Sequence, residues 1–289
     1  MKPEMKKIEA FMTEKDVNLF SYAAMTGDGV FEIVPGRGNP CNNSYSCTKS
    51  FAATAVGLLW DENKIGLDEP VTEVLKGEYD GFKDPKWEKV LVRHALSHTM
   101  GIDKGYLDID VEDIFAYGTD DFLTYALSEE LPHEPGTHYQ YSDAAFYIVS
   151  RLVGRRAGEK MDEYLMRKLL YPMHVQEAAF SRCPKNHPMG ATGLYIRSSD
   201  MVKLGYLYAN GGEIYGKKLL SEDWIRIDQE NGFAFQKTGV DGILGKGGML
   251  GQYLMYSPEK RFACAWHTYT TDNRLNGLVA LSKEVMENQ

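Results

Sequence analysis

The chain has 289 residues, of which 43% are hydrophobic and 25% charged, as is ordinary for a globular protein with a sizeable core. Its net charge of −9 comes without a basic cluster, which argues against nucleic acids and anionic membranes as partners. No apolar run reaches the roughly 18 residues of a membrane span, and the N-terminus lacks the apolar core of a signal peptide, so a cytoplasmic protein is expected. The scattered cysteines lack metal or redox spacing, so thiols are expected rather than disulfides.

The N-terminal part predicts a β-hairpin that leads into a buried helix. Residues 17–25 and 30–34 are rich in strand formers and flank a Thr-Gly-Asp-Gly turn, and residues 35–40 are expected to form a loop. Residues 44–60 become apolar on nearly every side after their first turn, which is typical of a helix buried all round. A further short helix is expected at 71–75.

The middle of the chain predicts helices, and the C-terminal part predicts strands. The expected helices span 89–98, 119–127 (capped by Thr119 or Asp120), 143–157, 161–171 and 198–210, with a loop at 131–137. The expected strands span 232–236, 252–256 and 261–266, and a helix follows at 275–286.

Because strands lie at both ends, we expect an α+β fold: an antiparallel sheet flanked by helices and built from both termini, with an inserted, mostly helical domain. The predicted sheet domain comprises 1–60 and 190–289, and the predicted helical domain comprises 61–189. An active site is expected at their junction.

Ser46 and Lys49 form the first candidate catalytic pair. At this spacing both side chains lie on one face of a helix, a turn apart. Burial favours the neutral amine, which can take a proton from the hydroxyl, and the helix N-terminus supplies N–H groups beside the serine. The alternative is an N-cap serine with a lysine that reaches solvent. A second Ser-x-x-Lys, Ser257 to Lys260, lies between two expected strands and predicts a hairpin turn, while Cys47 is expected to be a small core residue.

Two further motifs could complete such a site. Tyr141 follows a Pro-Gly loop and precedes a helix, where a phenol near ammonium groups can serve as a base, although a packed tyrosine is the alternative. Lys246 is followed by two glycines, which let a backbone approach a ligand closely unless they form an ordinary turn. The rival lysine motif is Lys237-Thr-Gly, whose position between strand-like segments favours a hairpin tip.

The histidines raise the alternative of a zinc hydrolase. His94 and His98 are four residues apart on an expected helix, and His133 and His138 could complete a ligand set. Ala95 stands where a helical zinc pair usually has a glutamate, so structural or capping histidines are favoured. The expected protein therefore uses no metal or other cofactor.

The order of the motifs resembles the serine β-lactamase-like superfamily, closest to class C β-lactamases, D-stereospecific peptidases and their esterase relatives. The motifs that carry the resemblance are Ser46-x-x-Lys49, residues 91–102, Pro135-Gly136 before Tyr141-Ser-Asp143, residues 190–200, and residues 246–252. The resemblance runs from about residue 17 to the end of the chain, and it implies a β-lactamase/transpeptidase-like fold.

The resemblance also implies a role for each matching position. Ser46 is the acylated nucleophile, and Lys49 and Tyr141 share its proton and return it to the leaving group. Lys246 matches the lysine of the third motif. The backbone N–H groups of Ser46 and Met249 form the oxyanion hole.

Asp143 and Gly247 depart from the family pattern. Asp143 stands where an asparagine amide holds the substrate, and an ionised carboxylate cannot donate that bond. Gly247 replaces the hydroxyl residue of the lysine-threonine-glycine form, and the expected substrate-binding residues are Asp143, Gly247, Gly248 and Met249. These departures predict inefficient hydrolysis of β-lactams. The favoured function is a serine hydrolase acting on a small-molecule ester or amide, and the alternative is a non-catalytic or slowly deacylating penicillin-binding or sensor-like module.

Overall fold

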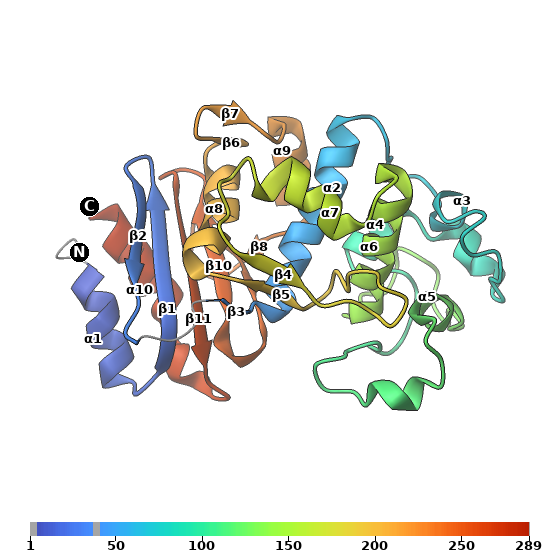
Figure 1. Ribbon diagram of the computed structural model, residues 1–289, viewed down its shortest axis with the longest axis horizontal. Coiled ribbons are helices and arrows are strands. Elements are labelled where there is room, and N and C mark those ends of the chain that lie inside the picture. Colours follow the sequence, from blue (N-terminus) through green and yellow to red (C-terminus); the bar gives the residue numbers. More distant parts are fainter. Residues whose placement is uncertain (1–4, 37–40, 289) are drawn as a thin grey trace. The chain divides into compact units, whose positions relative to one another are not determined.

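The computed structural model describes residues 5–36 and 41–288, and its contacts divide the chain into two compact units (Figure 1). Unit 1 comprises Met1–Cys47, Leu170–Ala179 and Leu194–Gln289, and unit 2 comprises Thr48–Leu169 and Phe180–Gly193. Unit 2 is therefore inserted into a unit that is built from both ends of the chain.

A six-stranded antiparallel sheet of order β2-β1-β11-β10-β9-β8 is the centre of unit 1. Its strands are β1 (Asn18–Thr26), β2 (Gly29–Ile33), β8 (Gln236–Lys237), β9 (Leu244–Gly247), β10 (Tyr253–Ser257) and β11 (Phe262–Tyr269). Shorter strands are β3 (Asn42–Asn43), β4 (Ala178–Phe180), β5 (Leu194–Ile196), β6 (Glu213–Ile214) and β7 (Lys217–Lys218). The N-terminal hairpin pairs with the C-terminal strand β11, and this confirms the predicted α+β fold.

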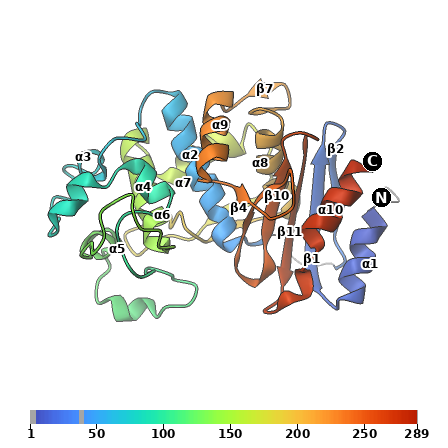
Figure 2. The ribbon, with the colours of Figure 1, turned by 180° about the vertical axis from the view of Figure 1, so that it is seen from behind.

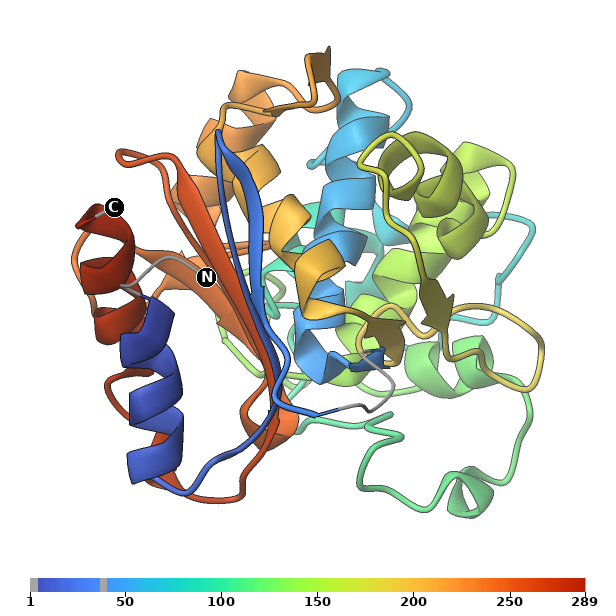
Figure 3. The ribbon, with the colours of Figure 1, turned by 60° about the vertical axis from the view of Figure 1, so that its left-hand side comes forward.

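Helices cover both faces of this sheet. The helices of unit 1 are α1 (Lys6–Glu14), α8 (Ser198–Ala209), α9 (Glu222–Asn231) and α10 (Leu278–Glu287), with short turns η2 (Tyr45–Cys47), η6 (Met249–Gly251) and η7 (Asn273–Leu275). In Figure 3, α1 and α10 lie together on one face, and α8 lies on the other. Figure 2, which shows the molecule from behind, has the same two helices beside the sheet. The core beneath α1 and α10 includes a stack in which Trp266 lies between Tyr22 and Tyr253, at ring-centroid distances of 5.8 and 5.1 Å.

Unit 2 is helical and is centred on two buried helices that pack against each other, α2 (Thr48–Asp61) and α6 (Asp143–Ala157). Around them lie α3 (Val71–Val74), η3 (Pro85–Lys89), α4 (Val92–Leu96), η4 (Ile114–Tyr117), α5 (Phe122–Leu127), α7 (Met161–Leu165) and the π-helical turn η5 (Met166–Leu170). Every residue from Thr48 to Leu59 is buried, which confirms that this helix is apolar because it is surrounded by protein.

Several predicted element boundaries are wrong. Helix α4 is shorter than expected, because residues 85–89 form a separate turn whose N-cap Asp84 accepts a bond from Lys86 N. Helix α5 is capped by Asp121, whose Oδ1 accepts a 3.2 Å bond from Thr124 N, and not by the two residues before it.

Other corrections concern elements that the pattern did not reveal. Residues 232–235 are not a strand, because Gly232 ends α9 with a φ of 70° and β8 begins only at Gln236. Helices α1 and α9 were not predicted, and α2 begins at Thr48, so Ser46 lies in the preceding turn η2 and not in the helix itself.

The remaining expectations about organisation have different outcomes. Of the loop expected at 35–40, residues 37–40 lie outside the described residues. No helix in the described ranges combines the length and apolar character needed to cross a membrane. By its contacts α2 belongs to unit 2, whereas the predicted boundary at residue 60 placed it in the sheet domain. Contacts within a unit do not show that the unit folds independently, so the domain boundaries stay a prediction.

Candidate active site

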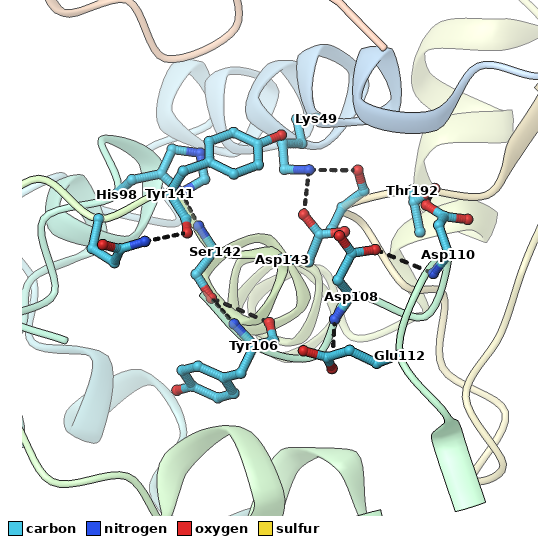
Figure 4. A network of polar contacts seen from close by, with 12 residues as sticks. Lys49, His98, Tyr106, Asp108, Asp110, Glu112, Tyr141, Ser142, Asp143 and Thr192 are labelled. Atoms are coloured by element: carbon cyan, nitrogen blue, oxygen red, sulfur yellow. Dashed lines mark hydrogen bonds and ion pairs between the residues drawn. The ribbon is translucent and has the colours of Figure 1, made fainter. Parts of the chain in front are cut away.

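Lys49 is fully buried in unit 2, where two oxygens hold its ammonium group (Figure 4). Its Nζ donates a 2.7 Å bond to Asp143 Oδ1 and a 2.9 Å bond to the carbonyl oxygen of Ala191. Lys49 lies in the first turn of α2, and Asp143 is the first residue of α6, so the packing of these two helices brings the charges together. The result is a buried ion pair with two fixed bonds to the lysine.

The surroundings of Lys49 decide its protonation state. Burial on its own lowers the pKa of Lys49, but the charge of Asp143 and the side-chain contact with Tyr141 outweigh it, and the pKa lies above its ordinary value of 10.5. The expectation that burial leaves Lys49 as a neutral amine is therefore wrong. Lys49 is an ammonium group at neutral pH, because the partner carboxylate is buried with it.

Tyr141 lies beside this ammonium group. The Lys49 Nζ is 4.8 Å from the centroid of the Tyr141 ring, and Tyr141 as a residue is 37% exposed. The loop that carries Tyr141 is fixed from behind: Gln140 N donates to the carbonyl oxygen of His98 at 2.9 Å, and Ser142 N donates to His98 Nδ1 at 3.3 Å. An anchored backbone thus holds a partly exposed tyrosine next to a fixed positive charge.

His98, which the sequence offered as a zinc ligand or a structural histidine, anchors the loop that carries Tyr141. Its ring is buried and lies 4.5 Å from the Tyr141 ring and 5.2 Å from the Phe146 ring, measured between centroids. Its backbone φ of 57° places it outside α4, which ends at Leu96. His94 and His98 are therefore not a pair on one helix, and the His94 ring caps the N-terminus of α4 by accepting a 3.2 Å bond from Leu91 N, which agrees with the favoured prediction of a capping histidine.

Three carboxyl groups gather near Lys49, from Asp108, Asp110 and Asp143, with one oxygen of each within 4.8 Å of the others. Burial and the charge of Asp143 raise the pKa of Asp108 above its ordinary value. Oxygen donors of this kind suit a hard divalent cation. All three already accept a hydrogen bond: Asp143 from Lys49, Asp110 from the Thr192 hydroxyl, and Asp108 from the backbone N–H of Asp110 (Figure 4).

The turn that carries Ser46 belongs to unit 1 and is fixed at both sides. Before it, Ser44 N donates to the carbonyl oxygen of Leu194 at 2.8 Å, and after it the Cys47 thiol donates to the carbonyl oxygen of Lys246 at 3.2 Å. Tyr45 has a φ of 46°, a left-handed conformation that a tyrosine rarely adopts. A strained residue directly before a candidate nucleophile is typical of a functional turn. Cys47 itself is buried, as expected.

The Lys246 segment runs along the same turn. Lys246 is a buried residue of β9, and a Cβ at Gly248 would clash with the carbonyl oxygen of Ser44, so only glycine fits there. Met249 follows in η6, which the Gln252 side chain pins by donating to Met249 O at 3.0 Å. Gly248 thus approaches the backbone beside Ser46 closely, while the expected approach of this segment to a ligand stays a prediction.

The other lysine motifs lie where the sequence placed them. Ser257 and Lys260 form the turn between β10 and β11, in which Lys260 N donates to Ser257 Oγ at 3.3 Å. Lys237 ends β8 at the hairpin that leads to β9. Neither motif joins a group of candidate catalytic residues.

Each unit therefore brings together part of the predicted site. Unit 2 gathers Lys49, Tyr141 and Asp143, and unit 1 gathers the Ser46 turn with residues 246–249. The union of the two sets in one active site, like the role of each residue, stays a prediction. The four cysteines, all within the described ranges, form no disulfide.

Comparison with known proteins agrees with this organisation. The Beta-lactamase family model matches residues 43–280, so the chain belongs to the Beta-lactamase family. Among curated proteins, protein flp of Staphylococcus aureus (strain N315) is 23% identical over 163 residues, which cover 54% of this chain and 31% of flp. The 6-aminohexanoate-dimer hydrolase of Paenarthrobacter ureafaciens is 27% identical over 198 residues, which cover 62% of this chain and 48% of that protein. The chain thus spans less than half the length of these curated relatives.

Solved structures match over nearly the whole chain. A penicillin-binding protein homologue from Caulobacter crescentus has a TM-score of 0.79 at 15% identity, with 98% of both chains covered. A family VIII carboxylesterase has a TM-score of 0.75 at 17% identity, again with 98% of both chains covered. At these identities the likeness establishes the fold. The chain has the β-lactamase/transpeptidase-like fold, and its relatives are named as hydrolases and penicillin-binding proteins.

Proposed function

We propose that the protein is a serine hydrolase that acts on a small-molecule ester or amide through an acyl-enzyme on Ser46. The observation that carries the proposal is the fixed ammonium group of Lys49 beside the partly exposed Tyr141. Ser46 precedes Lys49 by three residues and lies in a turn that is strained at Tyr45 and packed against Gly248. Family membership and the names of the carboxylesterase and dimer-hydrolase relatives support a hydrolase.

In the proposed reaction Tyr141 is the base. Its phenolate takes the proton of Ser46 as the serine oxygen attacks the substrate carbonyl carbon, and the proton then passes to the leaving group as its bond to that carbon breaks. The Lys49 ammonium stabilises the negative charge on the phenol oxygen, and its raised pKa disfavours Lys49 as the base. Water then attacks the acyl carbon and gives a proton to Tyr141; as the bond between that carbon and Ser46 Oγ breaks, Tyr141 returns the proton to Oγ, which releases the acid and restores Ser46.

The negative charge on the substrate oxygen needs donors fixed before the reaction. The backbone N–H groups of Ser46 and Met249 are proposed to supply them, with Lys246 as the nearby positive charge. Gly247 and Gly248 would line the edge of β9 along which the acyl group lies. Asp143 is proposed to act mainly through Lys49, and direct contact of Asp143 with substrate stays a prediction.

Replacement of the nucleophile tests the proposal. Ser46→Ala is expected to lower kcat/KM for a p-nitrophenyl ester by on the order of 10⁴-fold or more, as expected for loss of a nucleophile. Ser257→Ala is the matched control, because it removes the serine of the other Ser-x-x-Lys sequence, which lies in a hairpin turn. Unchanged hydrolysis by Ser46→Ala, or equal losses in both variants, would overturn the assignment.

A slowly deacylating penicillin-binding or sensor-like module is the second candidate. The Lys49–Asp143 ion pair favours it, because a carboxylate occupies the position where the family uses an asparagine amide toward the substrate. Intact-mass measurement after mixing with a β-lactam or an activated ester separates the two functions. A lasting adduct that requires Ser46 supports the sensor, and rapid turnover without an adduct supports the hydrolase.

A further inference from the structure

Asp228 is a buried carboxyl group that the proposed reaction does not use. It lies in the last turn of α9 and has no solvent-exposed surface. Its Oδ1 accepts a 2.6 Å bond from the backbone N–H of Ala234, which fixes the turn into β8. Its Oδ2 is also buried and has no hydrogen-bond partner within residues 5–36 and 41–288. A buried oxygen in this condition is costly as a carboxylate, so it is normally either protonated or paired.

Lys246 of β9 is the positively charged residue whose charge lowers the pKa of Asp228. Lys246 pairs with Leu254 of β10 and therefore shares its face of the sheet, the face on which Leu254 meets Gly205 of α8. From β10, Tyr256 also faces Asp228. Tyr208 of α8 reaches the same cluster through the Tyr256 ring, with 5.9 Å between the ring centroids.

Burial is the main influence on the Asp228 proton. It raises the pKa of Asp228 from 3.8 to about 7, against the opposing effects of the Ala234 and Phe235 N–H groups and of Lys246. The group thus changes charge in the neutral range. Burial also raises the pKa of Tyr256 far above that range, so the phenol stays neutral while the carboxyl titrates.

We propose that Asp228 is a positioning residue for Lys246 and acts as a proton-dependent switch: protonated, it leaves the ammonium group to the substrate, and ionised, it draws that group toward α9. The proposal rests on the proposed function in one respect only, the use of Lys246 at the active site. The physical reason is that an ionised Asp228 would be a buried charge that the Ala234 and Phe235 N–H groups stabilise only in part, and the Lys246 ammonium supplies an opposite charge that acts on it.

The pH dependence of ester hydrolysis tests the switch. The ratio of kcat/KM in the wild type to kcat/KM in Asp228→Asn, measured with p-nitrophenyl butyrate, cancels the pH dependence of the other proposed catalytic groups. This ratio is expected to fall roughly tenfold between about pH 6 and about pH 8, in proportion to the protonated fraction of one group. Asp228→Glu is expected to show the fall, relative to Asp228→Asn, at a shifted pH, and the control Tyr256→Phe is expected to keep the fall of the wild type. A ratio that does not change with pH, or a fall that disappears in Tyr256→Phe, overturns the proposal.

A second measurement needs neither hydrolysis nor a substitution at Asp228. Carboxyl ¹³C NMR of aspartate-labelled protein is expected to show one aspartate that titrates near neutral pH, and Lys246→Gln to move that titration to higher pH. No such aspartate, or an unmoved titration in Lys246→Gln, overturns the proposal. Ser46→Ala separates this outcome from a failure of the proposed function: if that variant hydrolyses the ester as fast as the wild type, the hydrolase assignment fails, and the NMR titration alone decides the coupling of Asp228 to Lys246.

Discussion

Both units hold a lysine of the proposed site next to a buried carboxyl group, but the two carboxyl groups are bound differently. In unit 2, Asp143 accepts a 2.7 Å bond directly from the Lys49 ammonium. In unit 1, Asp228 accepts a 2.6 Å bond from the backbone of Ala234, and its second oxygen finds no partner in the described part of the chain. Asp143 is hydrogen-bonded to a charged side chain, whereas Asp228 is hydrogen-bonded to the backbone of a turn.

Because only Lys49 is bonded to a side chain of opposite charge, burial fails to set the charge of Lys49 but does set that of Asp228. At Lys49 burial favours the neutral form, but the bonded carboxylate overcomes it and keeps the ammonium charged. At Asp228 burial also favours the neutral form, and the more weakly coupled Lys246 does not overcome it. Burial thus sets the direction of a pKa shift only where no partner of opposite charge is bonded to the group. One lysine of the proposed site has a constant charge, and the other lies beside a group that titrates.

The strongest test of the comparison removes Lys49. Lys49→Met leaves Asp143 buried without its counter-charge, and breaking one half of a buried pair typically costs about 3–5 kcal/mol. We expect the free energy of unfolding, measured in urea at neutral pH, to fall by that amount. Lys260→Met is the control, because Lys260 is half-exposed and forms an ion pair with the exposed Glu259, so its effect is expected to stay within about 0.5 kcal/mol. A loss at Lys49 as small as at Lys260 would show that Asp143 does not depend on this partner.

Most of the sheet could be predicted from sequence because its strands carry local signals. β1, β10 and β11 are runs of strand formers bounded by turns, and α6 has helical spacing of apolar residues with Gly158 after it. Helix α9 was missed because its sequence is mostly polar and its three buried residues include Asp228. Helix α1 was missed because its buried positions, Ile8 and Met12, give too short a pattern.

The candidate site was only partly predictable for a physical reason. Motif spacing indicates which residues can react, but it was the resemblance to the family that grouped Lys49 with Tyr141, and the two do lie side by side. It could not give the charge state of Lys49, which depends on the position of one oxygen of Asp143, 94 positions away along the chain. The packing of His98 against Tyr141 likewise depends on a left-handed backbone conformation that no periodicity reveals.

The second test follows stability against pH in unit 1. Because the pKa of Asp228 is about 7 in the folded protein and 3.8 ordinarily, the folded state holds a proton that the unfolded state releases, and stability declines as pH rises from about 4 to about 7. Asp228→Asn has no carboxyl proton to lose, so its free energy of unfolding relative to the wild type should rise across the same pH range and level off above it. The total rise should be at most about 4 kcal/mol, the free energy that corresponds to a pKa of about 7 instead of 3.8. Thermal or urea unfolding at several pH values checks this, and a difference that does not change with pH would contradict it.

The third test, of smaller size, replaces the other carboxyl group. Asp143→Asn keeps an oxygen that can accept the Lys49 bond but removes the charge, so a loss of roughly 1–3 kcal/mol in unfolding free energy is expected at neutral pH. A lysine pKa raised above 10.5 contributes stability that is present below that pH and is lost only as pH rises through the folded value. The loss of unfolding free energy in Asp143→Asn should therefore be constant between about pH 6 and about pH 9. The stability difference between Asp228→Asn and the wild type, by contrast, should still change between about pH 6 and about pH 7. Asp68→Asn, which removes a surface pair with Arg93, is the control and should change stability by less than about 0.5 kcal/mol. A pH-dependent loss in Asp143→Asn would mean that Lys49 titrates in the neutral range after all, and the contrast between the two lysines would disappear.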